Sequence, residues 1–301
     1  MWFKNLQLFY FSKPFTLKAE ELDEKLSSYT LGSCGAMELS SIGWIPPLGK
    51  ETEVLAHAAN GFIMICLGIQ EKLMPPAVIR DELQEKIDQI EGEEDRKVRG
   101  SEKVQLKDQI IHEMLPRAFV KKQRVYAYID PKNNWLVIDA ASRKMAEEFA
   151  EFLRVTLGSL PVVPPDVKLA PSSVFTKWLA SGSADSFAVD AECELQHQDI
   201  ESGTAKFKNM NLSSSEVMAH ISAGSVVTKI AVTWNEKISC FLTQELEVKR
   251  LKFDDAVKEE AAEQSGETDA ARFDADFAIM TYELSKFINA LIKQFDGLED
   301  L

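Results

Sequence analysis

The sequence lacks the short motifs that mark many enzymes and cofactor-binding proteins. It contains no glycine-rich nucleotide-binding motif, no HExxH or CxxC metal motif and no GxSxG nucleophile motif. A lone histidine is more often structural than a metal ligand, and the four histidines stand apart from one another: His57, His112, His197 and His220. The sequence therefore gives no positive evidence for an enzyme, a metal site or another cofactor.

Long apolar runs and closely spaced cysteines are also missing. No stretch approaches the 18 or more apolar residues of a membrane-spanning helix. The apolar start of the chain is interrupted by polar residues and has no small-residue cleavage site, which favours a first strand over a signal peptide. The four cysteines lie far apart in the sequence: Cys34, Cys66, Cys193 and Cys240. This wide spacing indicates that their thiols are reduced. We therefore expect a cytoplasmic protein with no membrane partner.

Apolar periodicity predicts an α+β fold with mixed or antiparallel sheets and packed helices. A chain of 301 residues can bury a large core and divide into two or three domains. The expected strands are 2–11, 36–45, 53–69, 119–129, 135–139, 187–195, 204–209 and a three-stranded meander over 226–253. The expected helices are 17–28, one opening at Pro75–Pro76, 102–115, 142–158, a short one opened by a capping box at 213–216, and a last one through 273–295. A proline-rich connection covers 159–173, and an acidic loop is expected at 257–270.

Acidic residues outnumber basic ones in this chain, and one segment reverses that balance. The whole chain has a formal net charge of −14. Residues 96–124 carry nine basic and three acidic side chains, so this segment is +6 and the rest of the chain is −20. The basic side chains are Arg96, Lys97, Arg99, Lys103, Lys107, Arg117, Lys121, Lys122 and Arg124. Segregation of this kind builds a local positive field that can attract a polyanion.

The two expected elements of this segment differ in how they present their cations. Lys103 and Lys107 share one helix face that becomes apolar further along, which fits a helix with a packed base and a solvated tip. Lys122 and Arg124 share a strand face with two tyrosines by period-two alternation, an arrangement suited to phosphate and sugar contacts. A solvated helix face and ordinary tyrosine packing are the structural alternatives. No arrangement of Asn, Gln and Arg predicts reading of base edges.

Several distinctive segments occur in order along nearly the whole chain: MWFKN, QEKLMPPAVIRDELQEK, LKDQIIHEMLPRAF, WLVIDAASRKMAEEFAEFLRVTLGSLPVVP, VVTKIAVTW, VKRLKF and ARFDADFAIMT. Together they resemble the family of the recombination-associated protein RdgC. The resemblance implies a nucleoid-associated protein that binds double-stranded DNA without sequence specificity and limits the access of the RecA recombinase. It leaves open whether single strands are preferred.

The resemblance also implies a horseshoe-shaped subunit that forms a ring-shaped homodimer around DNA. Its centre would be residues 1–74 and 119–160, its tip the inserted helical hairpin 75–118, and its base 161–301 with the main dimer interface. A smaller contact between tips, the gate, would use Phe119 of the LPRAF motif together with Leu115. Lys206 and Lys208 are further DNA-contact candidates, although their surroundings depart more from the family.

Three classes of function remain open from the sequence. The leading hypothesis is a non-catalytic, DNA-encircling clamp that limits recombination. The second is a scaffold whose basic segment docks an acidic protein. The third is a nuclease, against which the absence of clustered carboxylates near the basic segment argues.

Overall fold

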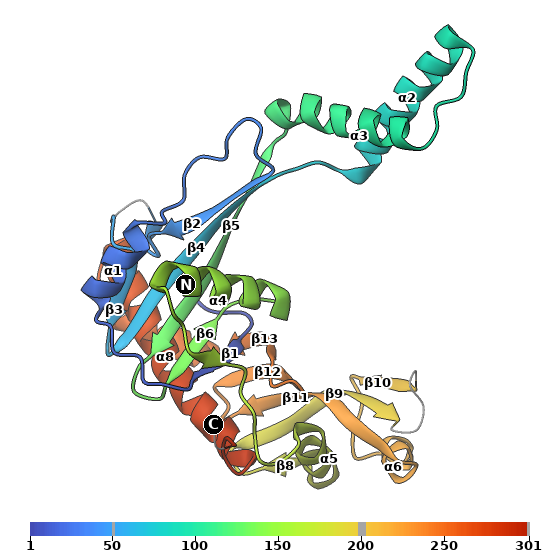
Figure 1. Ribbon diagram of the computed structural model, residues 1–301. Helices are drawn as coiled ribbons and strands as arrows, with labels where there is room; N and C mark the ends of the chain where they lie inside the picture. The colour runs from blue at the N-terminus through green and yellow to red at the C-terminus, as the bar shows by residue number, and fades with distance from the viewer. Residues whose placement is uncertain (50–51, 198–202, 300–301) are drawn as a thin grey trace. The chain divides into compact units, whose positions relative to one another are not determined.

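Antiparallel strands form two sheets in residues 1–49, 52–197 and 203–299, which the computed structural model describes (Figure 1). Sheet 1 has seven strands in the order β2-β4-β5-β6-β1-β7, with β3 also paired to β4. These strands are β1 (Gln7–Phe11), β2 (Ser40–Ile45), β3 (Ala56–Ala59), β4 (Phe62–Lys72), β5 (Val120–Asp130), β6 (Trp135–Ile138) and β7 (Val162–Val163). The mixed α+β fold with antiparallel sheets is therefore confirmed.

Sheet 2 has six strands in the order β10-β9-β11-β12-β13, with β8 paired to β9. Its strands are β8 (Ser183–Ala184), β9 (Phe187–His197), β10 (Thr204–Lys208), β11 (Ser225–Trp234), β12 (Ile238–Thr243) and β13 (Val248–Phe253). The helices are α1 (Ala19–Ser27), α2 (Pro76–Glu94), α3 (Ser101–Met114), α4 (Arg143–Leu157), α5 (Pro171–Ser181), α6 (Ser215–Ser222), α7 (Asp255–Glu263) and α8 (Asp269–Gln294). A 3₁₀ turn, η2 (Leu115–Arg117), follows α3. The expected meander over 226–253 is confirmed as β11–β13.

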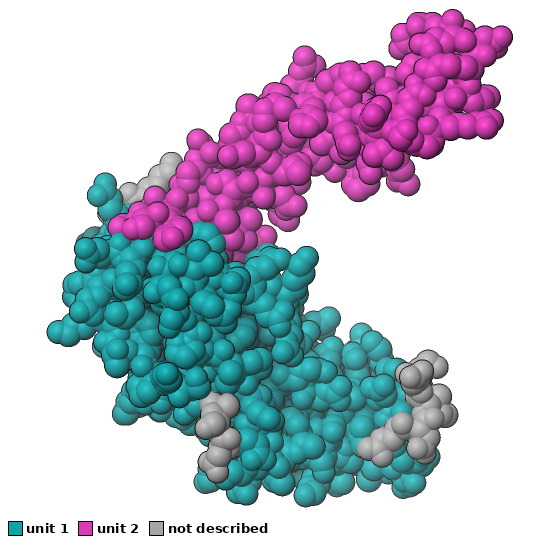
Figure 2. All heavy atoms as spheres, viewed as in Figure 1, with its two compact units in different colours: residues 1–26, 46–65, 126–301 teal, residues 27–45, 66–125 magenta. Residues whose placement is uncertain are grey.

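The chain forms two compact units (Figure 2). Unit 1 holds residues 1–26, 46–65 and 126–301, and unit 2 holds residues 27–45 and 66–125. Two of the unit boundaries fall inside β4 and β5, so each of these strands belongs partly to one unit and partly to the other. The division into centre, tip and base that the sequence suggested has different boundaries and stays a prediction.

The core of unit 1 is built by α8 and α5 against sheet 2. The buried residues of α8 include Phe277, Leu284 and Phe287, which lie seven and three residues apart, because the apolar stripe of this helix faces the core. From α5, Trp178 stacks on Phe187 of β9, with ring centroids 5.3 Å apart. The same cluster takes in side chains of sheet 1, so the two sheets share one core within this unit.

The helical hairpin of unit 2 has a small core of its own. Its buried side chains are Leu83 and Ile87 of α2, Val98 of the connection and Ile110 of α3. Pro76 stands in the first turn of α2, where its missing N–H costs no hydrogen bond. The predicted hairpin between strands is therefore confirmed, with α2 and α3 packed together through one narrow apolar seam.

Some expected elements differ from those observed. The range 53–69 is not one strand but β3 and β4, joined by a turn in which Asn60 and Gly61 both have positive φ, of 51° and 85°. The expected acidic loop at 257–270 is wrong over its first part, which belongs to α7. That helix forms because the Asp254 side chain accepts a hydrogen bond from the Ala256 N–H and because Val257 and Ala261 are buried.

Three further expectations need correction. The first strand begins only at Gln7, not at residue 2. The capping box at 213–216 is wrong, because the N-cap residue Ser214 makes no side-chain cap hydrogen bond. The connection at 159–173 leads directly into α5, which sequence reasoning missed although Pro171 at its start and Gly182 at its end are typical helix boundaries.

Burial makes the four thiols unequal in reactivity. Cys66, Cys193 and Cys240 are buried, whereas Cys34 is half-buried. Burial raises the pKa of Cys193 to about 11 and raises that of Cys240 further. Because only the thiolate attacks a disulfide reagent, we expect one thiol per chain to react rapidly in the native protein at pH 8 and four in urea. An Ellman titration measures this, and two or more rapid thiols in the native protein would contradict it.

Candidate nucleic-acid interface

The helical hairpin directs Lys103 and Lys107 away from its own core. Ile110 is buried between the helices, and Leu106 packs partly against the same cluster. Lys103 and Lys107 are exposed on α3, four residues apart on one face. The helix α3 therefore has the expected arrangement, with a packed base and a solvated cationic tip.

Two of the nine expected cations are neutralised within the hairpin. The Arg96 guanidinium forms ion pairs with Glu94 at 2.5 Å and with Glu102 at 2.6 Å. The Lys97 ammonium lies 2.5 Å from the Glu91 carboxylate. The hydrogen bond from Lys97 lowers the pKa of Glu91, so this acid remains ionised. A phosphate would have to compete with these carboxylates, which makes Arg96 and Lys97 weaker contacts than their charge suggests.

Most of the other basic side chains of the segment are exposed and keep their charge available. Within the described part of the chain, no ion pair is formed by Arg99, Lys103, Lys107, Arg117, Lys121 or Lys122. Arg124 is also exposed on β5. All seven lie in unit 2. The structure thus brings the expected cations together on one unit.

Lys206 and Lys208 belong to the other unit. Both are exposed on β10, the outer strand of sheet 2. The Lys206 ammonium lies 3.5 Å from the Glu194 carboxylate, which it shares with Lys229 at 3.1 Å. Lys206 is therefore partly neutralised, and Lys208 is the better candidate of the two.

The expected pairing of cations with accessible tyrosines is wrong. Lys122 and Arg124 are exposed, but further along the strand Tyr128 is fully buried and Tyr126 packs partly against the core of unit 1. Burial and the nearby Asp130 carboxylate raise the pKa of Tyr128 well above its usual value. The outer half of β5 is solvated and its inner half is core. The tyrosines therefore anchor the strand and are not available to sugar or phosphate.

Phe119 is an aromatic side chain held out into solvent. Its side chain is 83% exposed, the largest value among the exposed large apolar residues of the described chain. Its backbone is fixed, because its carbonyl oxygen accepts a hydrogen bond from the Leu73 N–H at 2.8 Å. Leu73 and Val120 beside it are exposed as well, at 47% and 36%. An exposed apolar cluster of this kind is typical of a contact surface and not of a core strand.

Leu115, the second residue expected at the gate, lies differently. It is 2% exposed and closes the end of α3 within its own unit. Any contact made by this surface therefore depends on Phe119, with Leu73 as the neighbour that sequence reasoning missed. The signal for Leu73 was a pair of apolar residues, Leu73 and Met74, directly before the Pro75–Pro76 helix start.

Two neighbouring carboxylates of α8, Asp274 and Asp276, have structural partners. An Asp274 carboxylate oxygen lies 2.7 Å from Nε2 of His57, and Asp276 pairs with the amino group of Met1. Across the described ranges, no group of three or more His, Cys, Asp and Glu side chains is arranged to hold a metal ion. Nor is any described helix long and apolar enough to cross a membrane.

Comparison with known proteins identifies the family. The family model described as "Putative exonuclease, RdgC" matches residues 1–298. The chain belongs to the RdgC family. Proteins named recombination-associated protein RdgC are similar to it over 99% of the chain: 42% identical in Tolumonas auensis, over 99% of that protein, 40% in Aeromonas hydrophila, over 99%, and 40% in Serratia proteamaculans, over 98%.

Membership of the RdgC family confirms the resemblance seen in the sequence and associates the chain with recombination. The family description names an exonuclease, whereas the names of these RdgC relatives state no catalytic activity.

Proposed function

We propose that the protein is a non-catalytic clamp that binds double-stranded DNA without sequence specificity. The observation that carries this proposal is the set of exposed, unpaired cations of unit 2 in a chain of net charge −14. Cations that have no carboxylate partner are free to neutralise phosphates, and the acidic remainder repels a polyanion from other surfaces. Contacts of this kind position a protein on the backbone and carry no sequence information.

The clamp acts as a ring-shaped homodimer in this proposal. Two horseshoe-shaped subunits meet through their bases in the second half of the chain and through a gate at Phe119. The exposed Phe119 side chain supports the gate, because a small interface can depend on one aromatic anchor. Such a ring on nucleoid DNA, in the cytoplasm, would limit recombination by obstructing the RecA filament. The recombination-associated names of the relatives support this role.

The salt dependence of binding tests the proposal. If about six to ten phosphates are neutralised per dimer, log affinity against log salt is expected to slope by about −5 to −9 on random duplexes. Reversing Lys103 and Lys107 to Glu removes two unpaired cations and is expected to weaken binding to all duplex sequences alike. Fluorescence anisotropy at several salt concentrations measures both effects. A slope near zero, or strong preference for one sequence, would contradict this function.

Two alternatives give different results in the same assays. A scaffold for an acidic protein would bind polyglutamate as tightly as DNA at equal salt. An exonuclease, the activity that the family description names, would shorten end-labelled duplexes in the presence of Mg²⁺ or Mn²⁺. We expect the labelled DNA to remain intact.

A further inference from the structure

A second group of unpaired cations lies in unit 1, on the face of sheet 2 that the core helices leave uncovered. The inward side chains of β12 and β13, such as Leu242 and Leu251, join the core with α5 and α8. The opposite face carries three exposed cations: Lys4, Arg250 and Lys252. We call these three the β13 cation cluster. None of them forms an ion pair with another described residue.

Backbone contacts hold the β13 cation cluster together. The Leu251 N–H donates to the Lys4 carbonyl oxygen at 2.8 Å, so the segment before β1 lies alongside β13. The Arg250 N–H donates to the Asn5 side chain at 3.2 Å. Lys4 is therefore a neighbour of Arg250 and Lys252 although more than 240 residues separate them in sequence.

A β-bulge aims Arg250 at its neighbouring strand. The pairing of β12 with β13 shifts between Ser239 and Phe241, and Arg250 adopts a positive φ of 52°. Bulges re-aim side chains, and a left-handed backbone at a non-glycine residue costs free energy. The Arg250 guanidinium carbon lies 5.3 Å from the centroid of the Phe241 ring. The strained backbone thus places a cation beside an aromatic ring on the uncovered face.

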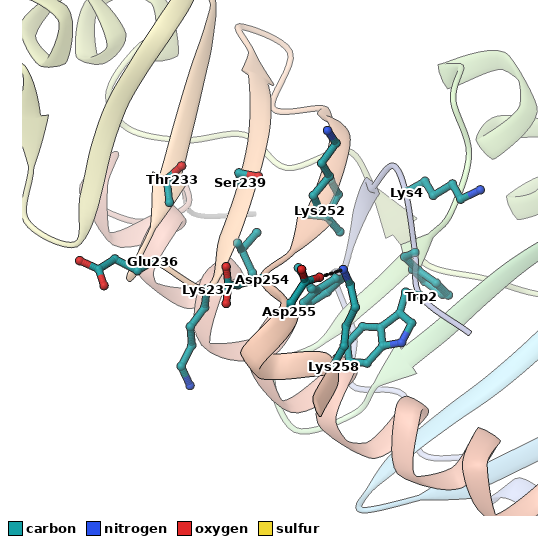
Figure 3. A pocket seen from close by; sticks show the side chains of 14 residues that line it. Trp2, Lys4, Thr233, Glu236, Lys237, Ser239, Lys252, Asp254, Asp255 and Lys258 are labelled. Carbon is teal, nitrogen blue, oxygen red and sulfur yellow. Dashed lines mark hydrogen bonds and ion pairs between the residues drawn. The ribbon is translucent and has the colours of Figure 1, made fainter. Parts of the chain in front are cut away.

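Two open pockets flank this cluster, with volumes of about 510 and 340 Å³, and both are lined by Ser239 and Lys252. The larger also contains Lys4, Trp2 and Thr233. Figure 3 shows Lys4 and Lys252 extending away from the strand, whereas Lys258 turns to Asp255, 2.9 Å away. The free cations therefore stand beside a concave surface that offers the Ser239 hydroxyl and aromatic rings. The Thr233 hydroxyl donates to the Asp190 carboxylate at 2.9 Å, and Glu236, Asp254 and Asp255 add carboxylates to the larger pocket.

Acidic side chains limit where a polyanion could lie. Asp190 and Glu192 of β9 line the smaller pocket opposite Arg250 and Lys252. They would repel phosphates from the β9 side. Glu236, Asp254 and Asp255 line the larger pocket and would repel phosphates from the end of β13, so a polyanion is confined to the three cations themselves. Hydroxyls suit phosphate oxygens, and aromatic rings beside cations suit sugars and bases. These groups favour a nucleic acid over an acidic peptide, which would present carboxylates without rings to stack.

We infer that the β13 cation cluster is a second binding site for the phosphodiester backbone of nucleic acid, separate from the cations of unit 2. This inference rests on the proposed DNA-binding function and adds three phosphate contacts to it. Each contact contributes about 0.9 to the salt slope on duplex DNA.

The test is the triple variant Lys4→Gln, Arg250→Gln and Lys252→Gln. For this variant, the slope of log affinity against log salt on a random duplex is expected to be shallower by about 2 to 3 for each subunit that contacts the DNA. The matched control is Lys13→Gln, Lys168→Gln and Lys177→Gln, which removes the same charge from exposed positions of unit 1 outside the cluster. The control is expected to keep the slope of the unaltered protein. Thermal melting followed by circular dichroism checks that the variants fold. If the triple variant does not fold, Lys252→Gln alone replaces it, and the expected change in the salt slope is then about 1.

The outcomes separate this inference from the proposed function. Equal slopes in the triple variant and the unaltered protein would overturn the inference while leaving DNA binding by unit 2 intact. Equal loss in the control would also overturn it, because net charge alone would then explain the effect. A triple variant that loses only polyglutamate binding would assign the cluster to an acidic protein. If the unaltered protein binds no DNA, the proposed function and this inference fall together.

Discussion

Replacing Phe119 with serine is expected to leave the protein folded and to abolish stable DNA binding. The Phe119 side chain is 83% exposed, so its removal takes almost no apolar area out of a core. Substitutions at such positions change the free energy of unfolding by about 0.5 kcal/mol or less. If Phe119 closes the gate, its loss opens the ring while every cation remains. The measurements are the melting temperature, the dimer mass by sedimentation and the affinity for a random duplex.

The control for this variant is Val104→Ser. Val104 is 60% exposed on α3 of the same hairpin. It removes an exposed apolar side chain from unit 2 without touching Phe119 or a cation, so DNA affinity is expected to stay unchanged. A large drop in melting temperature for Phe119→Ser would show that the side chain supports the fold. Unchanged affinity in both variants would remove the gate from the proposal.

Replacing Phe287 with alanine is expected to cause the largest loss of stability. Phe287 is fully buried on α8, and its ring lies 5.8 Å from that of Trp234 and 5.9 Å from that of Phe187. Removing a buried phenylalanine lowers the free energy of unfolding by about 3–5 kcal/mol, because transfer energy is lost and a cavity remains. Urea unfolding followed by tryptophan fluorescence measures this difference.

Tyr282 provides the comparison on the same helix. Its ring is 56% exposed and lies 3.7 Å from the Lys286 ammonium. Losing this exposed cation–π contact in Tyr282→Ala is expected to cost about 1 kcal/mol or less. The position of α8 at the centre of the core would be contradicted if Phe287→Ala lowered the free energy of unfolding by no more than Tyr282→Ala does.

The sequence predicts elements well where the apolar pattern is long and the boundaries carry specific residues. The last helix shows both, with a phenylalanine-rich stripe and Gly297 after its end. Its start was placed too late, because the expected loop covered Thr268, the N-cap residue whose side chain accepts from the Ala271 N–H. The acidic α7 was missed because its apolar stripe is short, with only Val257 and Ala261 buried. A short stripe gives no clear period, and the tertiary contacts that bury it are absent from local sequence.

The candidate site shows the same limit. Charge segregation in residues 96–124 was visible in the sequence, because counting charges needs no structure. The ion pairs of Arg96 and Lys97 were not visible, since they depend on which carboxylates the hairpin brings near. Period-two alternation placed Tyr128 correctly on a strand face but could not show that β5 passes from solvent into a core along its length. Arg250 was missed because a bulge changes the face on which its side chain lies.

The small core of the α2–α3 hairpin has a consequence for its motion. Only Leu83, Ile87, Val98 and Ile110 are buried in the cluster that joins the two helices, whereas α8 shares a core with two sheets. Elements with few buried apolar contacts open locally at a lower free energy than the whole chain unfolds. Backbone amides of α2 and α3 will therefore exchange with deuterium long before those of α8. The unpaired cations of α3 therefore belong to a hairpin that can unfold and refold locally while the rest of the chain stays native.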